Sequence, residues 1–141
     1  MTVNELQDQV IDEFSVFDDW IDKYNYLIDI GKSLPPIDAR HKTSDYLIEG
    51  CQSKVWLYTS FENGVINFSA DSDAIITRGI VALLVRILSG RTPAEIINSD
   101  LYFIDRIGLK QNLSPTRSNG LLSMVKQIKL YALAFSTKSN K

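Results

Sequence analysis

The sequence has a single cysteine, Cys51, and a single histidine, His41, among its 141 residues. One cysteine excludes an internal disulfide bond, and a metal site needs three or four converging ligands, which these two side chains do not provide. His41 lies in the polar segment 39–43 and is interpreted as an ordinary loop residue. A catalytic cysteine–histidine pair remains open, although nothing in the spacing supports it. No pair of carboxylates stands out as an acid–base couple.

Long apolar runs and an excess of basic charge are also missing. The longest apolar run, residues 79–85, ends at Arg86 and is far shorter than the roughly 20 residues that span a bilayer. A net charge of −2 gives no basic face for nucleic acid. Residues 1–5 lack the basic and apolar regions of a secretory signal. We therefore expect a cytoplasmic protein with a reduced thiol and with neither membrane nor nucleic-acid partners.

The length and the ordinary composition fit one domain, which we place at residues 1–136, followed by a polar tail at 137–141. Thr2 and Glu5 form a capping box that opens a first helix. The apolar spacing from Phe17 to Ile28 predicts a second helix, with Gly31 as its left-handed stop.

The middle of the chain is typical of a small sheet. Residues 55–61 and 65–68 are rich in β-branched and aromatic side chains, and the Asn63-Gly64 pair between them is a strong hairpin signal. Residues 46–48 are a candidate third strand, which would place Cys51 in a connection between strands.

Helical signals return after the sheet. Asp71 or Ser72 is the expected cap of a helix over about 73–89, closed by Gly90. Thr92-Pro93 and Ser114-Pro115 each open a further helix. The inner face of the last helix is expected to comprise Leu121, Leu122, Val125, Ile128, Ala132 and Phe135. The grouping predicts an α+β fold, with helices packed on one face of an antiparallel sheet of about three strands.

Cys51 has two readings from its neighbours alone. Free cysteines are often buried and act as small hydrophobic side chains. Gly50 before it and the polar Gln52 and Ser53 after it favour a tight loop instead. A loop thiol near a cation or a helix N-terminus ionises more readily, and the thiolate is the nucleophile. The residues by themselves indicate only a thiol with the potential to react.

The segment Gly50-Cys51-Gln52-Ser53-Lys54-Val55-Trp56 resembles the cysteine loop of the SufE family of sulfur acceptors. Further matches occur in family order: Tyr24 to Ile28 with Gly31, Asp71 to Ala74 with Gly79, Thr92-Pro93, and Leu113 to Leu121. The resemblance thus covers about residues 6–134. Lys54 is a departure, since the family often has glutamine there.

The resemblance implies a fold like that of SufE and IscU proteins, and a function. Cys51 would take sulfur as a persulfide from a PLP-dependent cysteine desulfurase (SufS-like), stimulate that enzyme, and pass the sulfur to an iron–sulfur scaffold (SufB-like). The chain would need no cofactor or metal of its own, because PLP belongs to the partner. It would be a sulfur-transfer accessory protein with a covalent intermediate, and not a stand-alone desulfurase.

The resemblance also gives expectations for individual residues. Arg117, expected in the first turn of the last helix, would stabilise a thiolate or persulfide; the alternative is a solvated surface arginine. Asp73 is either functional or simply a favourable carboxylate at a helix start. Gly50, Gln52, Ser53 and Trp56 would support the loop or bind the partner, with Trp56 interpreted as core or pocket wall.

Two other functions remain to be separated from sulfur relay. One is an iron–sulfur scaffold of the IscU type, which the single cysteine argues against because clusters are held mainly by several cysteine thiolates. The other is a module that activates a desulfurase by docking alone.

Overall fold

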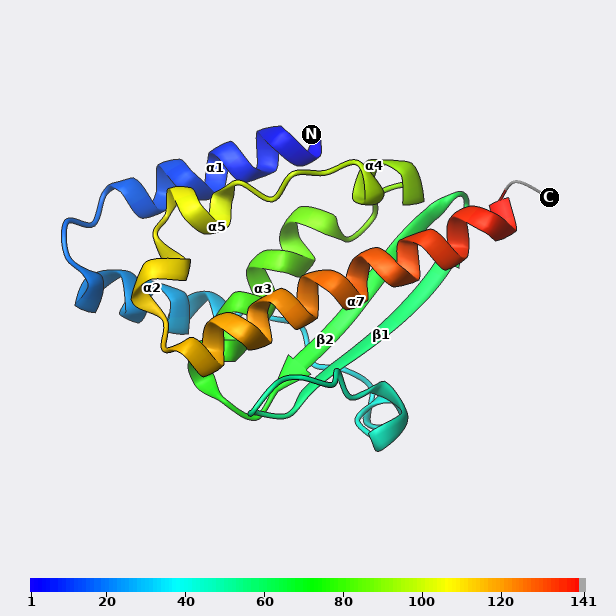
Figure 1. Cartoon of the computed structure of the whole chain (residues 1–141), viewed down its shortest axis with the longest axis horizontal. Coiled ribbons are helices and arrows are strands. Elements are labelled where there is room, and N and C mark those ends of the chain that lie inside the picture. The colour runs from blue at the N-terminus through cyan, green and yellow to red at the C-terminus, as the bar shows by residue number, and fades with distance from the viewer. Residues whose placement is uncertain (140–141) are drawn as a thin grey trace.

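The computed structural model describes residues 1–139, with side chains described through residue 137. The elements follow one another as helices, a hairpin, and helices again (Figure 1): α1 (Val3–Ser15), α2 (Trp20–Lys32), the 3-10 turns η1 (Ala39–His41) and η2 (Ser44–Tyr46), β1 (Val55–Glu62), β2 (Val65–Ser72), α3 (Ile75–Leu88), α4 (Pro93–Ile97), α5 (Phe103–Arg106), α6 (Leu109–Asn112) and α7 (Pro115–Ser139).

The first two helices begin where side chains cap them. The predicted Thr2–Glu5 capping box is confirmed, and the Asp19 carboxylate accepts two backbone N–H bonds at the start of α2. The prediction that Gly31 ends α2 as a left-handed residue is wrong. Gly31 lies inside the helix, and α2 ends at Lys32 with Ser33 as its C-cap, just before the Pro35-Pro36 pair.

Gly31 has a packing role instead. A Cβ at Gly31 would lie 2.8 Å from the backbone nitrogen of Gly79, and a Cβ at Gly79 would lie 2.2 Å from the carbonyl oxygen of Leu27. The two glycines therefore let the backbones of α2 and α3 approach where the helices cross.

The sheet is a two-stranded antiparallel hairpin over the described residues. Asn63 and Gly64 form the predicted tight turn, both with positive φ (55° and 81°), and the register pairs Glu62 with Val65 and Val55 with Ser72. Val55 and Leu57 on β1 point to the same face as their neighbours on β2, and this face is buried.

The predicted third strand is wrong. Leu47 makes only an isolated bridge to Trp56, and the residues just before it form η2. One backbone bond, from Ile48 N–H to the Val55 carbonyl at 2.9 Å, marks the end of the pairing. The chain then turns away through Gly50, whose φ is +88°, so no ladder develops.

The start of α3 also differs from expectation. Strand β2 continues to Ser72, and α3 begins at Ile75 behind Ala74, whose side chain cannot cap it. The Ser72 hydroxyl still accepts from the Ala74 N–H at 3.3 Å, but it lies in the strand rather than at the helix cap. Gly90, with φ of +79°, follows the end of α3 as predicted.

The last helix, α7, is longer than predicted. It starts at Pro115 as the Ser114-Pro115 pair indicates, and it continues through Ser139. Thr137 to Ser139, expected to be tail, thus have helical backbone; residues 140–141 lie outside the described residues. Leu122, expected on the inner face, is 57% exposed, and Met124 is buried in the core instead.

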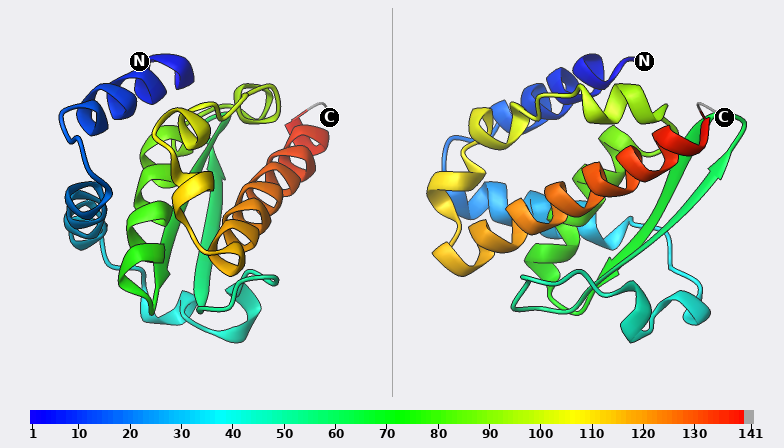
Figure 2. Two further views of the ribbon diagram at one scale, coloured as in Figure 1. Left: turned by 60° about the vertical axis from the view of Figure 1, so that its left-hand side comes forward. Right: turned by 45° about the vertical axis from the view of Figure 1, so that its right-hand side comes forward.

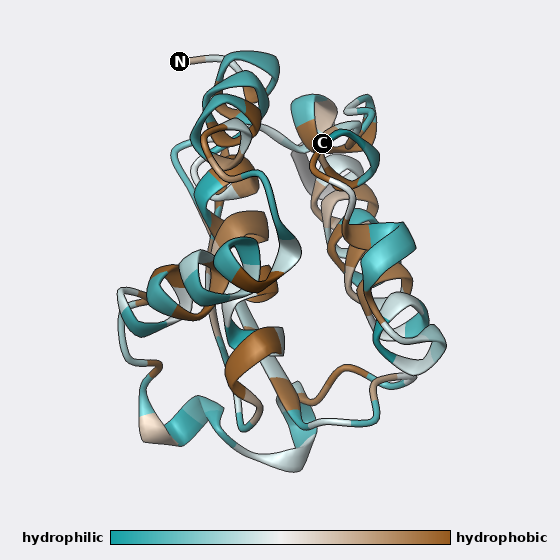
Figure 3. Cartoon of the chain, turned by 90° about the vertical axis from the view of Figure 1, so that its left-hand side faces the viewer, coloured by the Kyte–Doolittle hydropathy of each residue, from teal (hydrophilic) through white to brown (hydrophobic). Residues whose placement is uncertain are grey.

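Helices α3 and α7 cover one face of the hairpin, and α1 and α2 pack farther out (Figure 2). In Figure 3, hydrophobic (brown) and hydrophilic (teal) stretches alternate along the helix ribbons, as expected of helices with one buried side. The buried apolar side chains form one connected core from Val3 to Ala132. The opposite face of the hairpin carries η1 and η2, where the His41 ring stacks on Tyr58 with 3.5 Å between ring centroids. The fold is α+β, as predicted. Over the described part of the chain, none of the helices combines the length and apolar character needed to cross a bilayer.

Candidate functional site

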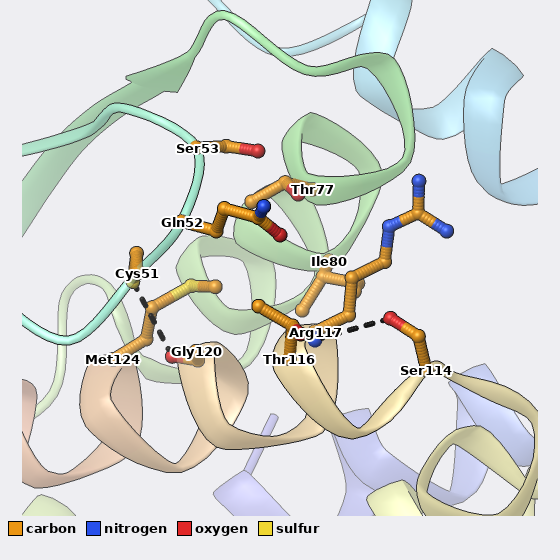
Figure 4. A pocket seen from close by; sticks show the side chains of 10 residues that line it. All are labelled: Cys51, Gln52, Ser53, Thr77, Ile80, Ser114, Thr116, Arg117, Gly120 and Met124. Atoms are coloured by element: carbon orange, nitrogen blue, oxygen red, sulfur yellow. Dashed lines mark hydrogen bonds between the residues drawn. The ribbon is translucent and has the colours of Figure 1, made fainter.

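Cys51 lies at a cavity of about 200 Å³ between the loop that precedes β1 and two helices (Figure 4). Three parts of the chain line this cavity: the loop residues 51–53, the first turns of α3, and the first turns of α7. The lining residues are Cys51, Gln52, Ser53, Thr77, Ile80, Ser114, Thr116, Arg117, Gly120 and Met124. The cavity brings together segments that are more than 60 residues apart in the sequence.

The Cys51 thiol is half-buried and turned toward α7. Its S–H donates to the backbone carbonyl of Gly120, with Sγ 3.5 Å from the oxygen. Burial raises the pKa of the Cys51 thiol above its ordinary value, because a buried thiolate loses hydration. At neutral pH the resting side chain is therefore a protonated thiol, and its proton is directed at a helix carbonyl.

Two glycines shape the surroundings of the sulfur. Gly50 has φ of +88°, and a Cβ there would lie 2.4 Å from the Ser123 hydroxyl oxygen on α7. The loop can therefore lie against α7 only with glycine at position 50. Gly120 is buried inside α7, and a Cβ there would lie 3.6 Å from Sγ of Cys51, which is ordinary van der Waals contact.

Asp73 holds the other end of the cysteine loop. Its carboxylate accepts a hydrogen bond from the Lys54 N–H at 3.0 Å, and its own N–H donates to the Lys54 carbonyl at 3.2 Å. Both interpretations from the sequence placed Asp73 in the first turn of a helix, and this placement is wrong because it lies between β2 and α3. The carboxylate positions the residue at which the loop joins β1.

Ser72 and Asp71 reinforce this junction. The Ser72 hydroxyl donates to the Lys54 carbonyl at 2.8 Å. The Asp71 carboxylate lies 3.1 Å from Nζ of Lys42 and 2.9 Å from Nε of Arg78. Burial acts to raise the pKa of Asp71, but the Ser72 N–H and the two cations outweigh it and lower that pKa. A carboxylate therefore links the 3-10 segment, β2 and α3 beside the loop.

Arg117 lies where the sequence predicts, in the first turn of α7, and its N–H donates to the Ser114 hydroxyl at 3.3 Å. Its side chain is exposed and lines the cavity, but the guanidinium points away from the Cys51 sulfur (Figure 4). In this conformation the guanidinium does not offset the cost of ionising the thiol.

Of the remaining candidate residues, some line the cavity and Trp56 lies on the far side of the hairpin. Gln52 and Ser53 line the cavity, and the Gln52 side chain points across it (Figure 4). Trp56 is half-buried on the opposite face, where Lys42 lies 4.8 Å from its ring centroid. Trp56 is thus neither core nor a wall of this cavity, because alternate residues of β1 face opposite sides.

Sequence reasoning gave no role to Gly120, Ser123 or Thr77. For Gly120 a signal existed, since a glycine within a long helix costs stability and usually marks a close approach. Nothing in the sequence identified the other two, because the packing of α7 against the loop brings them to the site. Within the described residues, no group of three or more His, Cys, Asp and Glu side chains is arranged to hold a metal ion.

The fold and the site define an α+β protein with one half-buried thiol at a cavity between a glycine-started loop and a long helix. A family model described as SufE, an Fe–S metabolism associated domain, matches residues 8–132. The chain belongs to the SufE family. Its membership associates it with iron–sulfur metabolism.

Similar proteins agree with this assignment. A SufE-like protein of Rhizobium etli is 46% identical over 127 residues, covering 86% of each chain. One from Rhizobium meliloti is 42% identical over 127 residues, covering 86% of this chain and 91% of the relative. A SufE-like protein of Arabidopsis thaliana, described as chloroplastic/mitochondrial, is 44% identical over 117 residues, which are 82% of this chain but 32% of that protein.

The fold recurs in a solved structure. The solution structure of a hypothetical protein from Thermus thermophilus matches with a TM-score of 0.76 over 94% of this chain and 96% of the other. The sequence identity is 17%, so this match concerns the fold alone.

Proposed function

We propose that this protein accepts sulfur from a cysteine desulfurase onto Cys51, stimulates that enzyme by removing its product, and delivers the sulfur to iron–sulfur cluster assembly. The observation that carries the proposal is the Cys51 thiol at the cavity between α7 and the loop that precedes β1, in a chain of the SufE family. The thiol is the only cysteine of the chain, so every covalent sulfur step must use it.

The transfer is a thiol–persulfide exchange. The Cys51 thiolate attacks the outer sulfur of a persulfide on the desulfurase cysteine. A new S–S bond forms on Cys51, the S–S bond of the donor breaks, and the donor cysteine leaves as a thiolate that takes up a proton. No external oxidant or reductant is needed, because the sulfane sulfur moves without a net change in electrons.

The resting geometry sets one condition on this step. The attacking group is the thiolate, whereas the S–H of Cys51 is held by the Gly120 carbonyl and its pKa is raised. The loop must therefore move the sulfur away from Gly120 before attack. Arg117, at the rim of the same cavity, is the cation that we assign to stabilising the sulfur anion once the loop has moved.

Partners and location follow from the same proposal. The sulfur donor is a SufS-like desulfurase that carries its own PLP, and the acceptor is a SufB-like iron–sulfur scaffold. The protein itself uses no cofactor or metal, and it works in a reducing compartment such as the cytoplasm, because its thiol must stay free.

The test is intact mass spectrometry after incubation with a cysteine desulfurase, its PLP and cysteine. We expect Cys51 to gain the mass of one sulfur atom, and we expect both this gain and the stimulation of desulfurase turnover to vanish in Cys51→Ser. Glu62→Ala, which alters an exposed carboxylate at the far end of the hairpin and keeps the thiol, should retain the added sulfur.

The same experiment separates the two competing functions. If Cys51→Ser stimulates the desulfurase as well as the wild type does, the protein acts by docking alone and the carrier mechanism is wrong. If the wild-type monomer instead holds a stable iron–sulfur cluster after reconstitution, with its visible absorption, the scaffold function replaces sulfur relay.

A further inference from the structure

Helix α7 presents apolar side chains on two opposite sides. One side belongs to the core and comprises the buried Leu121, Met124, Ile128 and Ala132. The other carries Leu122, Leu130 and Leu133, which are 57%, 48% and 53% exposed. Both views in Figure 2 show α7 at the outside of the molecule, and α4 packs beside it.

The exposed leucines share one face with Lys126. The positions 122, 126, 130 and 133 follow helical spacing and form a stripe about 16 Å long at 1.5 Å per residue. At about 100° per residue, Leu122 lies roughly 200° around the helix from Gly120, which faces Cys51. The leucine stripe is therefore turned away from the cysteine cavity, and a protein covering Cys51 leaves it free.

The stripe borders a shallow, open hollow on the surface of the protein. A hollow of about 300 Å³ lies along α7, lined by Ile97 of α4, Leu130, Leu133, Lys126 and Lys129. Lys129 donates from Nζ to the Ser99 carbonyl at 2.7 Å, which fastens the segment after α4 to α7. The Lys126 side chain remains exposed at the rim. An apolar hollow with a fixed wall suits protruding apolar side chains better than the plane of a bilayer.

Charge indicates the kind of partner. Residues 115–139, which form α7, include four Lys and Arg and no Asp or Glu, whereas residues 1–50 include four Lys and Arg and eleven Asp and Glu. The positive field around α7 attracts an acidic surface and repels a basic one.

We propose that the leucine stripe of α7 is a docking surface for an acidic, amphipathic segment of a partner protein. The segment places apolar side chains in the hollow between α4 and α7 and carboxylates near Lys126. Cys51 stays reachable while this surface is occupied, so the protein can hold one partner through α7 and exchange sulfur with another. The docking surface itself does not depend on the sulfur chemistry proposed for Cys51.

The test uses the full chain and a defined probe, a helical peptide with leucine at i, i+4 spacing and glutamate at its other positions. Titration followed by ¹⁵N–¹H NMR should shift amides from 122 to 133 and at Ile97. In Leu130→Ser/Leu133→Ser, binding should weaken by about tenfold, because two leucines no longer bury apolar surface. Val16→Ser/Ile21→Ser removes side chains that are 72% and 71% exposed elsewhere, and should bind as the wild type does.

Several results would overturn the proposal. These are no shift at millimolar peptide, equal binding of a counterpart peptide with lysine in place of glutamate, or shifts confined to residues other than 122–133 and Ile97. Leucine-dependent self-association in sedimentation would make a second copy of the chain the occupant, and leucine-dependent binding to phosphatidylserine vesicles would make it a membrane. Loss of Cys51 alkylation in the peptide complex would refute the separation of the two surfaces.

Discussion

The hydrogen bond from the Lys54 N–H to the Asp73 carboxylate restrains the loop that carries Cys51, and a single substitution can remove it. Asp73→Ala removes this bond, which is 3.0 Å long, while the Lys54 carbonyl keeps its bonds from the Asp73 N–H and the Ser72 hydroxyl. These two remaining bonds keep the ends of β1 and β2 that lie away from the turn together. Only the residue that joins the cysteine loop to β1 loses a partner, so the loop should open more often.

The expected size of the effect follows from that single bond. A hydrogen bond to a charged group contributes about 1.5–3 kcal/mol, and the exposure of Asp73 reduces this to about 1 kcal/mol. If the whole contribution favours the closed loop, its loss raises the population of open loops about fivefold. Opening also rehydrates the Cys51 sulfur and brings its pKa back toward the ordinary value, which acts in the same direction at neutral pH.

The assay is the rate of Cys51 alkylation by iodoacetamide, followed by intact mass. We expect a severalfold faster rate in Asp73→Ala, partial recovery in Asp73→Asn, whose amide oxygen can still accept, and no change in Glu62→Ala, an exposed carboxylate at the far end of the hairpin. An unchanged or slower rate in Asp73→Ala, with the thermal midpoint retained, would refute the idea that this bond restrains the loop.

Three further outcomes are expected. Gly79→Ala should lower the free energy of unfolding by about 2 kcal/mol in urea titrations, because its Cβ would lie 2.2 Å from the Leu27 carbonyl oxygen. Gly120→Ala, whose Cβ would make only ordinary contacts, should raise the free energy of unfolding by up to about 1 kcal/mol, because alanine has the higher helix propensity. Equal effects of the two substitutions would contradict the close crossing of α2 and α3. The alkylation rate of Cys51 should rise with pH, and the midpoint of this rise should lie at higher pH than in the urea-unfolded chain, because only the thiolate reacts and folding raises the pKa of the thiol. By the same linkage, the free energy of unfolding should fall as pH rises through the pKa of the unfolded thiol. Arg117→Ala should slow sulfur transfer while the circular dichroism spectrum is retained. An unchanged rate would mean that Arg117 is a solvated surface residue with no part in the transfer.

Local signals in the sequence predicted most element starts. The Thr2–Glu5 box, the Asn63-Gly64 turn and the Ser114-Pro115 pair each act through neighbouring residues, so the sequence contains their whole cause. Gly31 was misread because a glycine near the end of a helical pattern fits two roles. Only the position of α3 shows that the absent Cβ serves the contact with Gly79 rather than a helix stop.

The site was predictable to the extent that it is local. The loop position of Cys51 follows from Gly50, but the acceptor for its S–H is a helix carbonyl 69 residues away. Asp73 was read as a helix-start carboxylate because β2 was expected to end earlier than it does. Because β2 runs to Ser72, the Asp73 carboxylate does not cap a helix and accepts a hydrogen bond from the Lys54 N–H of the loop instead.

The resting site and the proposed reaction differ in one coordinate, the position of the loop. One end of the cysteine loop is fixed by the hydrogen bond from the Lys54 N–H to Asp73, and at the other end the absence of a Cβ lets Gly50 lie close to Ser123 of α7. In the proposed reaction, movement of this loop separates the sulfur from the Gly120 carbonyl. Under the proposed function, a donor that docks on the loop and α7 would expose the thiol, favour its ionisation and bring Arg117 within reach in a single movement. Activation of the thiol would then follow from docking, and the thiol would stay protonated until a partner is present.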